Sequence, residues 1–180
     1  MIAGSIARRY AKALLEIGIA GKSCDGIQRE LERVTAVYQA SPELATALEN
    51  PVFPASQRKQ VMEEVARRLM VSKVVRNFLM LLLDRGRIAA LPSISREHRL
   101  LVDAHAGRVR ARISTPRPLA PATEARLKSA LERRTGKAVI LEMHEDPSLI
   151  GGVVTQIGDL VFDGSVRTQL ANLRQQLLSE

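Results

Sequence analysis

The sequence predicts an α+β protein in which an N-terminal six-helix bundle is followed by a small α+β domain. Apolar residues recur at steps of three and four positions up to about residue 104, which is typical of helices. An alternation of period two, typical of a strand, first appears at 108–113. We therefore expect the bundle at 1–104 and the second domain at 105–180. The second domain is near the smallest size that is stable alone, which favours a need for a partner.

Apolar stripes and end signals define the first three helices. The first helix ends near Gly18 and Gly21. Ser41 is the predicted N-cap of a short third helix that begins at Pro42 and ends before Pro51. The stripes consist of Ile6, Tyr10, Ala13, Leu14 and Ile17 in the first helix and of Ile27, Leu31, Val34 and Tyr38 in the second.

The next three helices begin at Pro54, Ser72 and Pro92. Ser72 is a predicted N-cap, and Asp84-Arg85-Gly86 ends the fifth helix. The positions that share a face are Val61, Val65 and Leu69 in the fourth helix, Val74, Val75, Phe78, Leu79 and Leu82 in the fifth, and Ile94, His98 and Leu101 in the sixth.

The second domain mixes strands and helices. Residues 108–113 alternate charged and apolar side chains, which predicts a strand with one basic, solvated face. A helix at 121–134 with Gly136 as its C-cap precedes a strand at 139–143. The remaining elements are a hairpin of 153–157 and 160–162 around Gly158-Asp159, and a last helix capped by Ser165 with Val166, Leu170, Leu173 and Leu177 on one face.

Composition narrows the classes of function. The chain has 180 residues, with 27 Lys and Arg against 19 Asp and Glu, so its net charge is +8. This charge suggests an acidic partner, a nucleic acid or an anionic membrane surface, without choosing among them. Aromatic residues make up only 3%, which disfavours stacking platforms for single-stranded nucleic acid. The longest apolar run, Phe78–Leu83, is far shorter than the roughly 20 residues that cross a bilayer. Cys24, the single cysteine, excludes an intrachain disulfide and a multi-cysteine metal site.

No pattern predicts a catalytic, cofactor or metal site. Gly21-Lys22-Ser23 matches the end of a phosphate-binding loop, but Glu16 stands where the motif needs glycine and a helix precedes it. His98 and His105 share a helical face without a third ligand, so we interpret them as surface or interface histidines. We therefore expect no enzyme activity and no cofactor.

Two helices carry more apolar surface than one core face needs. Beside its main stripe, the first helix has small residues at Ala3, Ala7 and Ala11, followed by Leu15 and Gly18. The fifth helix is apolar almost all round, so it is either central in the bundle or covered by a partner. If a partner covers this helix, we expect a groove beside the first helix that receives an amphipathic helix. Gly151-Gly152 likewise allows either a tight internal turn or a partner contact.

Three segments together indicate a family. They are Ala7–Leu14, Asn77–Arg87 and Asp146–Val153, the last continuing to Phe162-Asp163-Gly164-Ser165-Val166. With these segments in order over the whole chain, the sequence resembles the delta subunit of bacterial F-type ATP synthase and is similar to the mitochondrial oligomycin-sensitivity-conferring protein. Met1–Lys22 could pass for a mitochondrial presequence. Because the motif begins at Ala7, we expect this segment to be the first helix of a mature bacterial subunit.

The resemblance implies a non-catalytic stator subunit of a rotary, proton-translocating ATP synthase. It implies that the first and fifth helices form a groove for the N-terminal helix of the alpha subunit, and that the C-terminal domain engages the b subunit of the peripheral stalk. The implied groove residues are Ala7, Tyr10, Ala11, Leu14, Val75, Phe78, Leu79 and Leu82, and the implied stalk residues are Gly151, Gly152 and Val153, with the last helix. The implied location is the cytoplasmic side of the bacterial inner membrane, with no nucleic acid and no small-molecule substrate.

The alternative function is a basic nucleic-acid-binding module. The net charge and the basic face formed by Arg108, Arg110 and Arg112 favour it, and this run is not a motif of the family. The excess positive charge is spread over both predicted domains and is not gathered on one recognition helix, which weakens this alternative.

Overall fold

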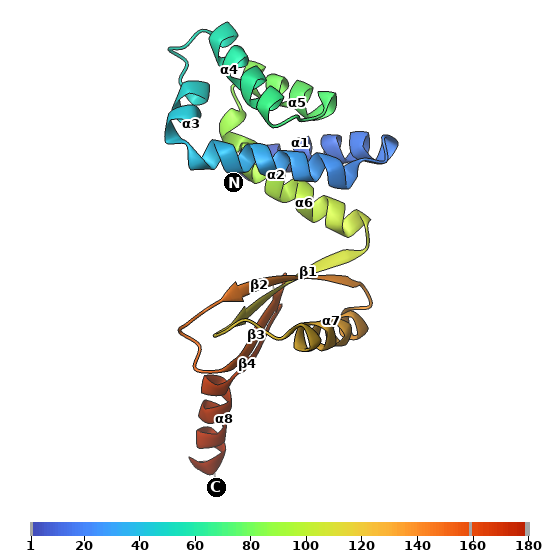
Figure 1. Cartoon of the computed structure of the whole chain (residues 1–180), viewed down its shortest axis with the longest axis vertical. Coiled ribbons are helices and arrows are strands. Elements are labelled where there is room, and N and C mark those ends of the chain that lie inside the picture. The colour runs from blue at the N-terminus through green and yellow to red at the C-terminus, as the bar shows by residue number, and fades with distance from the viewer. Residues whose placement is uncertain (1, 159, 179–180) are drawn as a thin grey trace. The chain divides into compact units, whose positions relative to one another are not determined.

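The computed structural model describes residues 2–158 and 160–178 (Figure 1). The chain divides into two compact units, Met1–Val102 and Asp103–Glu180. The described residues form eight α-helices and one four-stranded sheet, so the predicted α+β class is confirmed. Within the described ranges, no helix is long and apolar enough to cross a membrane.

The first unit is built from helices. Serine caps were predicted at Ser41 and Ser72, and both are confirmed: their hydroxyls accept from the backbone N–H of Leu44 at 3.2 Å and of Val75 at 3.4 Å. The sequence analysis missed η1, a short 3₁₀ helix directly before the sixth α-helix. The elements are α1 (Ile2–Ala20), α2 (Cys24–Ala40), α3 (Pro42–Glu49), α4 (Ala55–Arg68), α5 (Lys73–Asp84), η1 (Ile88–Ala90) and α6 (Leu91–His105), the last of which continues into the second unit.

The core of the first unit uses the predicted faces of α1 and α4 only in part: Leu14 belongs to the core and Val65 and Leu69 pack against it, as predicted. In α1 the small side is buried and Ala13 and Ile17 are exposed. Gly18 explains this rotation, because a Cβ there would lie 3.1 Å from the Sγ of Cys24, so α1 and α2 meet too closely for larger side chains. In α4, Met62 and Ala66 are buried and the predicted Val61 is exposed. The core members are Ala7, Ala11, Leu14, Ile27, Leu31, Val34, Tyr38, Leu48, Met62, Val75, Phe78, Leu79, Leu82, Leu83, Ile88, Leu91 and Ile94.

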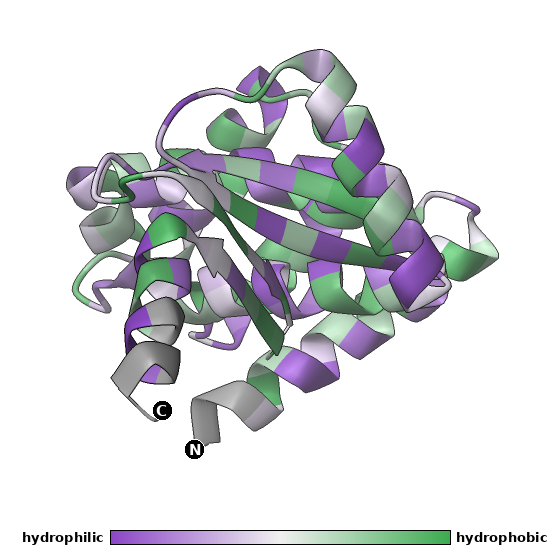
Figure 2. Ribbon diagram, turned by 90° about the horizontal axis from the view of Figure 1, so that it is seen from below, coloured by the Kyte–Doolittle hydropathy of each residue, from purple (hydrophilic) through white to green (hydrophobic). Residues whose placement is uncertain are grey.

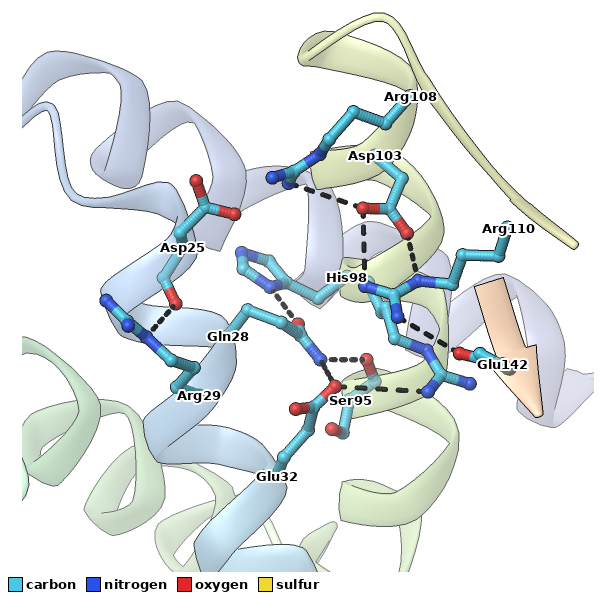
Figure 3. A network of polar contacts seen from close by, with 11 residues as sticks. Asp25, Gln28, Arg29, Glu32, Ser95, His98, Asp103, Arg108, Arg110 and Glu142 are labelled. Atoms are coloured by element: carbon cyan, nitrogen blue, oxygen red, sulfur yellow. Dashed lines mark hydrogen bonds and ion pairs between the residues drawn. The ribbon is translucent and has the colours of Figure 1, made fainter. Parts of the chain in front are cut away.

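A buried polar contact ties α2 to α6, and of the two interpretations of His98, as a surface or an interface histidine, it excludes the surface one. His98 is fully buried, and its Nδ1 lies 2.6 Å from the Oε1 of Gln28 (Figure 3). Because an amide oxygen only accepts, Nδ1 carries the proton. The Gln28 amide nitrogen donates to Glu32 at 2.8 Å and to the Ser95 carbonyl at 3.3 Å. The Nε2 of His98 is buried without a hydrogen-bond partner among the described residues.

The second unit holds a sheet with strand order β2-β1-β3-β4. The β1 and β2 strands are parallel and joined through α7, whereas the other pairs are antiparallel. Gly136 ends α7 in the left-handed region at φ +65°, so the predicted C-cap is confirmed. The elements are β1 (Arg108–Thr115), α7 (Pro121–Thr135), β2 (Ala138–Glu145), β3 (Gly152–Ile157), β4 (Leu160–Ser165) and α8 (Val166–Leu178).

Helix α7 covers one face of the sheet. Along the strands, hydrophobic and hydrophilic residues alternate (Figure 2). Ala111 and Ile113 of β1 and Val139 of β2 form the core of this unit with Leu131 of α7. In the predicted turn at Gly158-Asp159, Asp159 lies outside the described residues.

Helix α8 begins at the end of β4. The hydroxyl of Ser165 accepts from the N–H of Thr168 at 3.3 Å, which confirms the predicted cap. Leu170 is 57% exposed. Leu173 and Leu177, the other predicted apolar positions, lie outside the described side chains.

The opposite face of β1 is not the solvated basic surface that was predicted. Asp103 is buried, and its carboxylate lies 3.3 Å from the Nη2 of Arg108 and 2.5 Å from the Nε of Arg110. Arg110 also lies 3.0 Å from Glu142 of β2 (Figure 3). Of the three arginines only Arg112 is exposed. Two of the three cations that favoured nucleic-acid binding are therefore held by carboxylates of their own unit.

His98 makes the stability of the first unit depend on pH. Burial lowers the pKa of His98 to about 4, whereas an unfolded histidine titrates near 6.5. Between these values the unfolded chain binds more protons, so stability decreases as the pH falls from about 6.5 to about 4, by up to about 3 kcal/mol. We expect His98→Asn, which can keep the bond to Gln28, to lose less stability over this window in urea unfolding. An equal loss in both proteins would contradict the assignment.

Candidate partner-binding surfaces

The implied helix-groove residues lie on α1 and α5, and most of them are buried. Tyr10 is half-buried, and the other residues belong to the core of the first unit. The buried members are Ala7, Ala11, Leu14, Val75, Phe78, Leu79 and Leu82. They position the two helices, and their side chains offer little surface to a partner.

A different set of apolar side chains is accessible on α1 and α5. Ile6 and Tyr10 are half-buried, and Ile17, at the same helical face, is 50% exposed. On α5, Val74 is half-buried and Leu81 is 42% exposed. We call this set, together with Phe78, the α1–α5 seam: Ile6, Tyr10, Ile17, Val74, Phe78 and Leu81. Helical spacing of four and seven positions places the α1 members along one line, so they form a continuous apolar stripe.

Tyr10 and Phe78 join the two sides of the seam. Their ring centroids lie 6.1 Å apart in an edge-to-face arrangement. Arg87, just beyond α5, places its guanidinium 5.8 Å from the Tyr10 ring centroid and donates to the Tyr10 hydroxyl at 3.3 Å. The sequence analysis named the two aromatic residues but assigned no role to Arg87. The sequence signal for Arg87 was its position directly after Gly86, the glycine that ends the fifth helix.

The glycine pair of the second unit serves internal contacts. The N–H of Val166 donates to the Gly151 carbonyl at 3.0 Å. Gly152 has φ +86°, and a Cβ there would lie 2.3 Å from the Gly164 carbonyl oxygen. Only glycine fits this close approach of β3 and β4. Of the two alternatives left open by the sequence, the geometry favours a tight internal turn, and a stalk contact at Gly151 and Gly152 stays a prediction.

Val153 lines a groove between α7 and the sheet. The groove has a volume of about 620 Å³, and its apolar lining includes Leu127, Leu131 and Phe162. Arg134 of α7 lies over the Phe162 ring, 4.8 Å from its centroid. The groove therefore combines an apolar floor with a cationic edge. Sequence patterns could not locate it, because it forms only when α7 is placed on β3 and β4.

The described residues contain no cluster of three or more potential metal ligands.

A family model described as ATP synthase delta (OSCP) subunit matches residues 6–177 of this chain. The chain belongs to this family. The match covers both units, so the family resemblance drawn from the three sequence segments is confirmed.

Several relatives are similar over nearly their full length. The chain is 44% identical to the ATP synthase subunit delta of Trichlorobacter lovleyi and 43% identical to that of Geobacter sp. strain M21, in each case over 98% of both chains. Among solved structures, a chain of the Toxoplasma gondii mitochondrial ATP synthase hexamer matches with a TM-score of 0.65 at 24% identity, covering 96% of this chain and 97% of that one. This last likeness shows a shared fold.

Family membership establishes the general role. The protein is a subunit of the F-type ATP synthase and a component of its peripheral stalk, and it is structural and not catalytic. The prediction that it is not an enzyme is thereby confirmed. The family places its function in binding surfaces, so the α1–α5 seam and the α7 groove are the surfaces to consider.

Gly152→Ala tests the internal role of the glycine pair. The added Cβ meets the Gly164 carbonyl oxygen at 2.3 Å, so we expect a loss of about 2–4 kcal/mol in the free energy of unfolding. Gly158→Ala is the matched control: Gly158 also has positive φ, at +58°, but its Cβ would have no neighbour within 4 Å. It should cost only about 1 kcal/mol, from backbone strain alone. Equal losses in urea unfolding would show that the close approach is unimportant.

Proposed function

We propose that this protein is the connector between the catalytic head and the peripheral stalk of a bacterial ATP synthase. Its helical unit acts as a six-helix bundle that binds the N-terminal helix of an alpha subunit, and its second unit binds the C-terminal region of the b subunit. The complex would hold the protein peripherally on the cytoplasmic side of the plasma membrane. Family membership and bacterial relatives identical at 43–44% support this assignment.

The observation that supports the head contact best is the α1–α5 seam. Ile17 and Leu81 are large apolar side chains left accessible on two helices that meet through Tyr10 and Phe78. Because about half of each side chain is already buried, covering the rest by an apolar partner contributes roughly 1 kcal/mol to the free energy of binding. The stripe length fits one amphipathic helix with anchors at i, i+3, i+4 and i+7. The proposed docking site is therefore the seam, with Ala7 and Ala11 supporting it from the core.

The stalk contact is proposed at the α7 groove. Val153, one of the implied stalk residues, lines this groove, and Phe162 extends its apolar floor. Leu170 of α8 adds an accessible apolar side chain in the same unit. An apolar floor beside Arg133 and Arg134 fits a helical segment that carries apolar and acidic residues.

As a connector the protein would work without any chemical step. The rotor applies torque to the head, and the stalk must hold the head still if that torque is to drive ATP synthesis. Such a tether has to stay bound for longer than a catalytic cycle, which demands slow dissociation. Buried apolar anchors provide slow dissociation, whereas exposed charge pairs mainly change the rate of association.

Substitutions in the α1–α5 seam test the head contact. We expect a peptide of the alpha-subunit N-terminus to bind the full chain with a Kd on the order of 1 μM or tighter. Ile17→Glu and Leu81→Glu should each weaken binding by about tenfold or more, because each places a charge in an apolar contact. Leu100→Glu on α6 is the control, since Leu100 is equally accessible, at 56%, and lies outside the seam. Absence of peptide binding to the unmodified chain in calorimetry would refute the proposal.

A substitution in α7 tests the stalk contact. Ala130 is exposed and lines the groove, so Ala130→Glu should fold normally and weaken binding of the soluble b-subunit region by about tenfold. Ala125→Glu makes the same change on an exposed position of α7 away from that groove, and should leave binding unchanged. If both variants bind the b subunit equally well, the stalk contact lies elsewhere on the second unit.

A further inference from the structure

The Arg85-Gly86-Arg87 motif ends α5 in a way that fixes the position of Arg87. Gly86 has φ +60°, in the left-handed region. The N–H of Gly86 donates to the Leu83 carbonyl at 3.0 Å, and the N–H of Arg87 donates to the Leu82 carbonyl at 2.8 Å. These two bonds form a Schellman motif. The chain therefore reverses at Gly86, and the Arg87 side chain reaches Tyr10 on α1.

Arg87 is a cation whose binding capacity is mostly unused. It is half-buried, and within the described residues its contacts are the ring and the hydroxyl of Tyr10, with no ion pair. A guanidinium has five N–H donors, and one of them is used here. By contrast, Arg108 and Arg110 of the second unit both lie against carboxylates. The Tyr10 contact holds the Arg87 guanidinium at the α1–α5 seam without neutralising it.

We propose that Arg87 determines the specificity of the seam by binding a carboxylate of the incoming helix. This inference rests on the proposed head contact. A helix that covers Tyr10 also covers the guanidinium stacked on it, and removing an unpaired cation from water is costly. An acidic side chain beside the apolar stripe of the partner offsets this cost and adds a charge-assisted hydrogen bond. The partner is therefore an amphipathic helix with an acidic residue at one fixed position, and helices that are apolar alone are rejected.

The experiment measures binding of the alpha-subunit N-terminal peptide to the full chain by calorimetry at several salt concentrations. Arg87→Met should weaken binding by about 10- to 100-fold and flatten its salt dependence. Arg87→Lys should restore part of the affinity, because it keeps the charge and loses the fork of donors. Arg85→Met is the matched control: Arg85 is exposed and carries the same charge two positions earlier, so binding should change by less than about twofold.

A peptide series identifies the carboxylate. Each acidic residue of the peptide is replaced by its amide, and one replacement should weaken binding to the unmodified chain but not to Arg87→Met. This pattern is specific for a pair, whereas damage to the end of α5 would weaken all peptides alike. If no amide replacement weakens binding to the unmodified chain, or if Arg87→Met binds as the unmodified chain does, the inference is overturned while the head contact stands. If the unmodified chain binds no peptide, both fail.

Discussion

The close approach of α1 to α2 is the constraint on which the functional surface of the first unit depends. Gly18 meets Cys24 so closely that a Cβ would be crowded, and Ala7 and Ala11 are fully buried on the same side of α1. Because the small side faces inward, the bulky side of α1 faces the seam with α5. Tyr10 and Ile17 are accessible there as a direct consequence. One helix thus supplies both a tightly fitted core face and an accessible apolar surface, the one proposed above for the head contact.

The elements could be predicted from the sequence, but the buried faces could not. Ser41, Ser72 and Gly136 mark ends through local hydrogen bonds and backbone geometry, which depend on few neighbours, and all three behave as predicted. A helical period, however, only identifies apolar stripes. On α1 the bulky stripe and the small-residue stripe are offset by one sequence position, so they lie side by side on the helix surface. Which of the two is buried depends on how closely α2 approaches. The bulkier stripe was predicted to be buried, whereas the structure buries Ala7 and Ala11 of the smaller stripe together with Leu14 of the bulkier one.

Contacts between different elements of the fold account for the remaining errors. The surface interpretation of His98 is wrong because its partner, Gln28, lies 70 positions away, where no local pattern reveals it. Arg110 was assigned to a solvated face because strand alternation gives no sign of Asp103 at the end of a preceding helix or of Glu142 on β2. The same limit applies to the binding surfaces: the family resemblance pointed to α1 and α5, but exposure on the folded chain determines which of their residues a partner can reach.

Accessible apolar side chains are costly for a chain that spends time alone, since they favour aggregation. Ile17, Leu81 and Leu170 are exposed to this extent in the folded chain, although each helix could have carried a polar residue there without disturbing its core. The net charge of +8 counteracts this tendency by mutual repulsion between free chains.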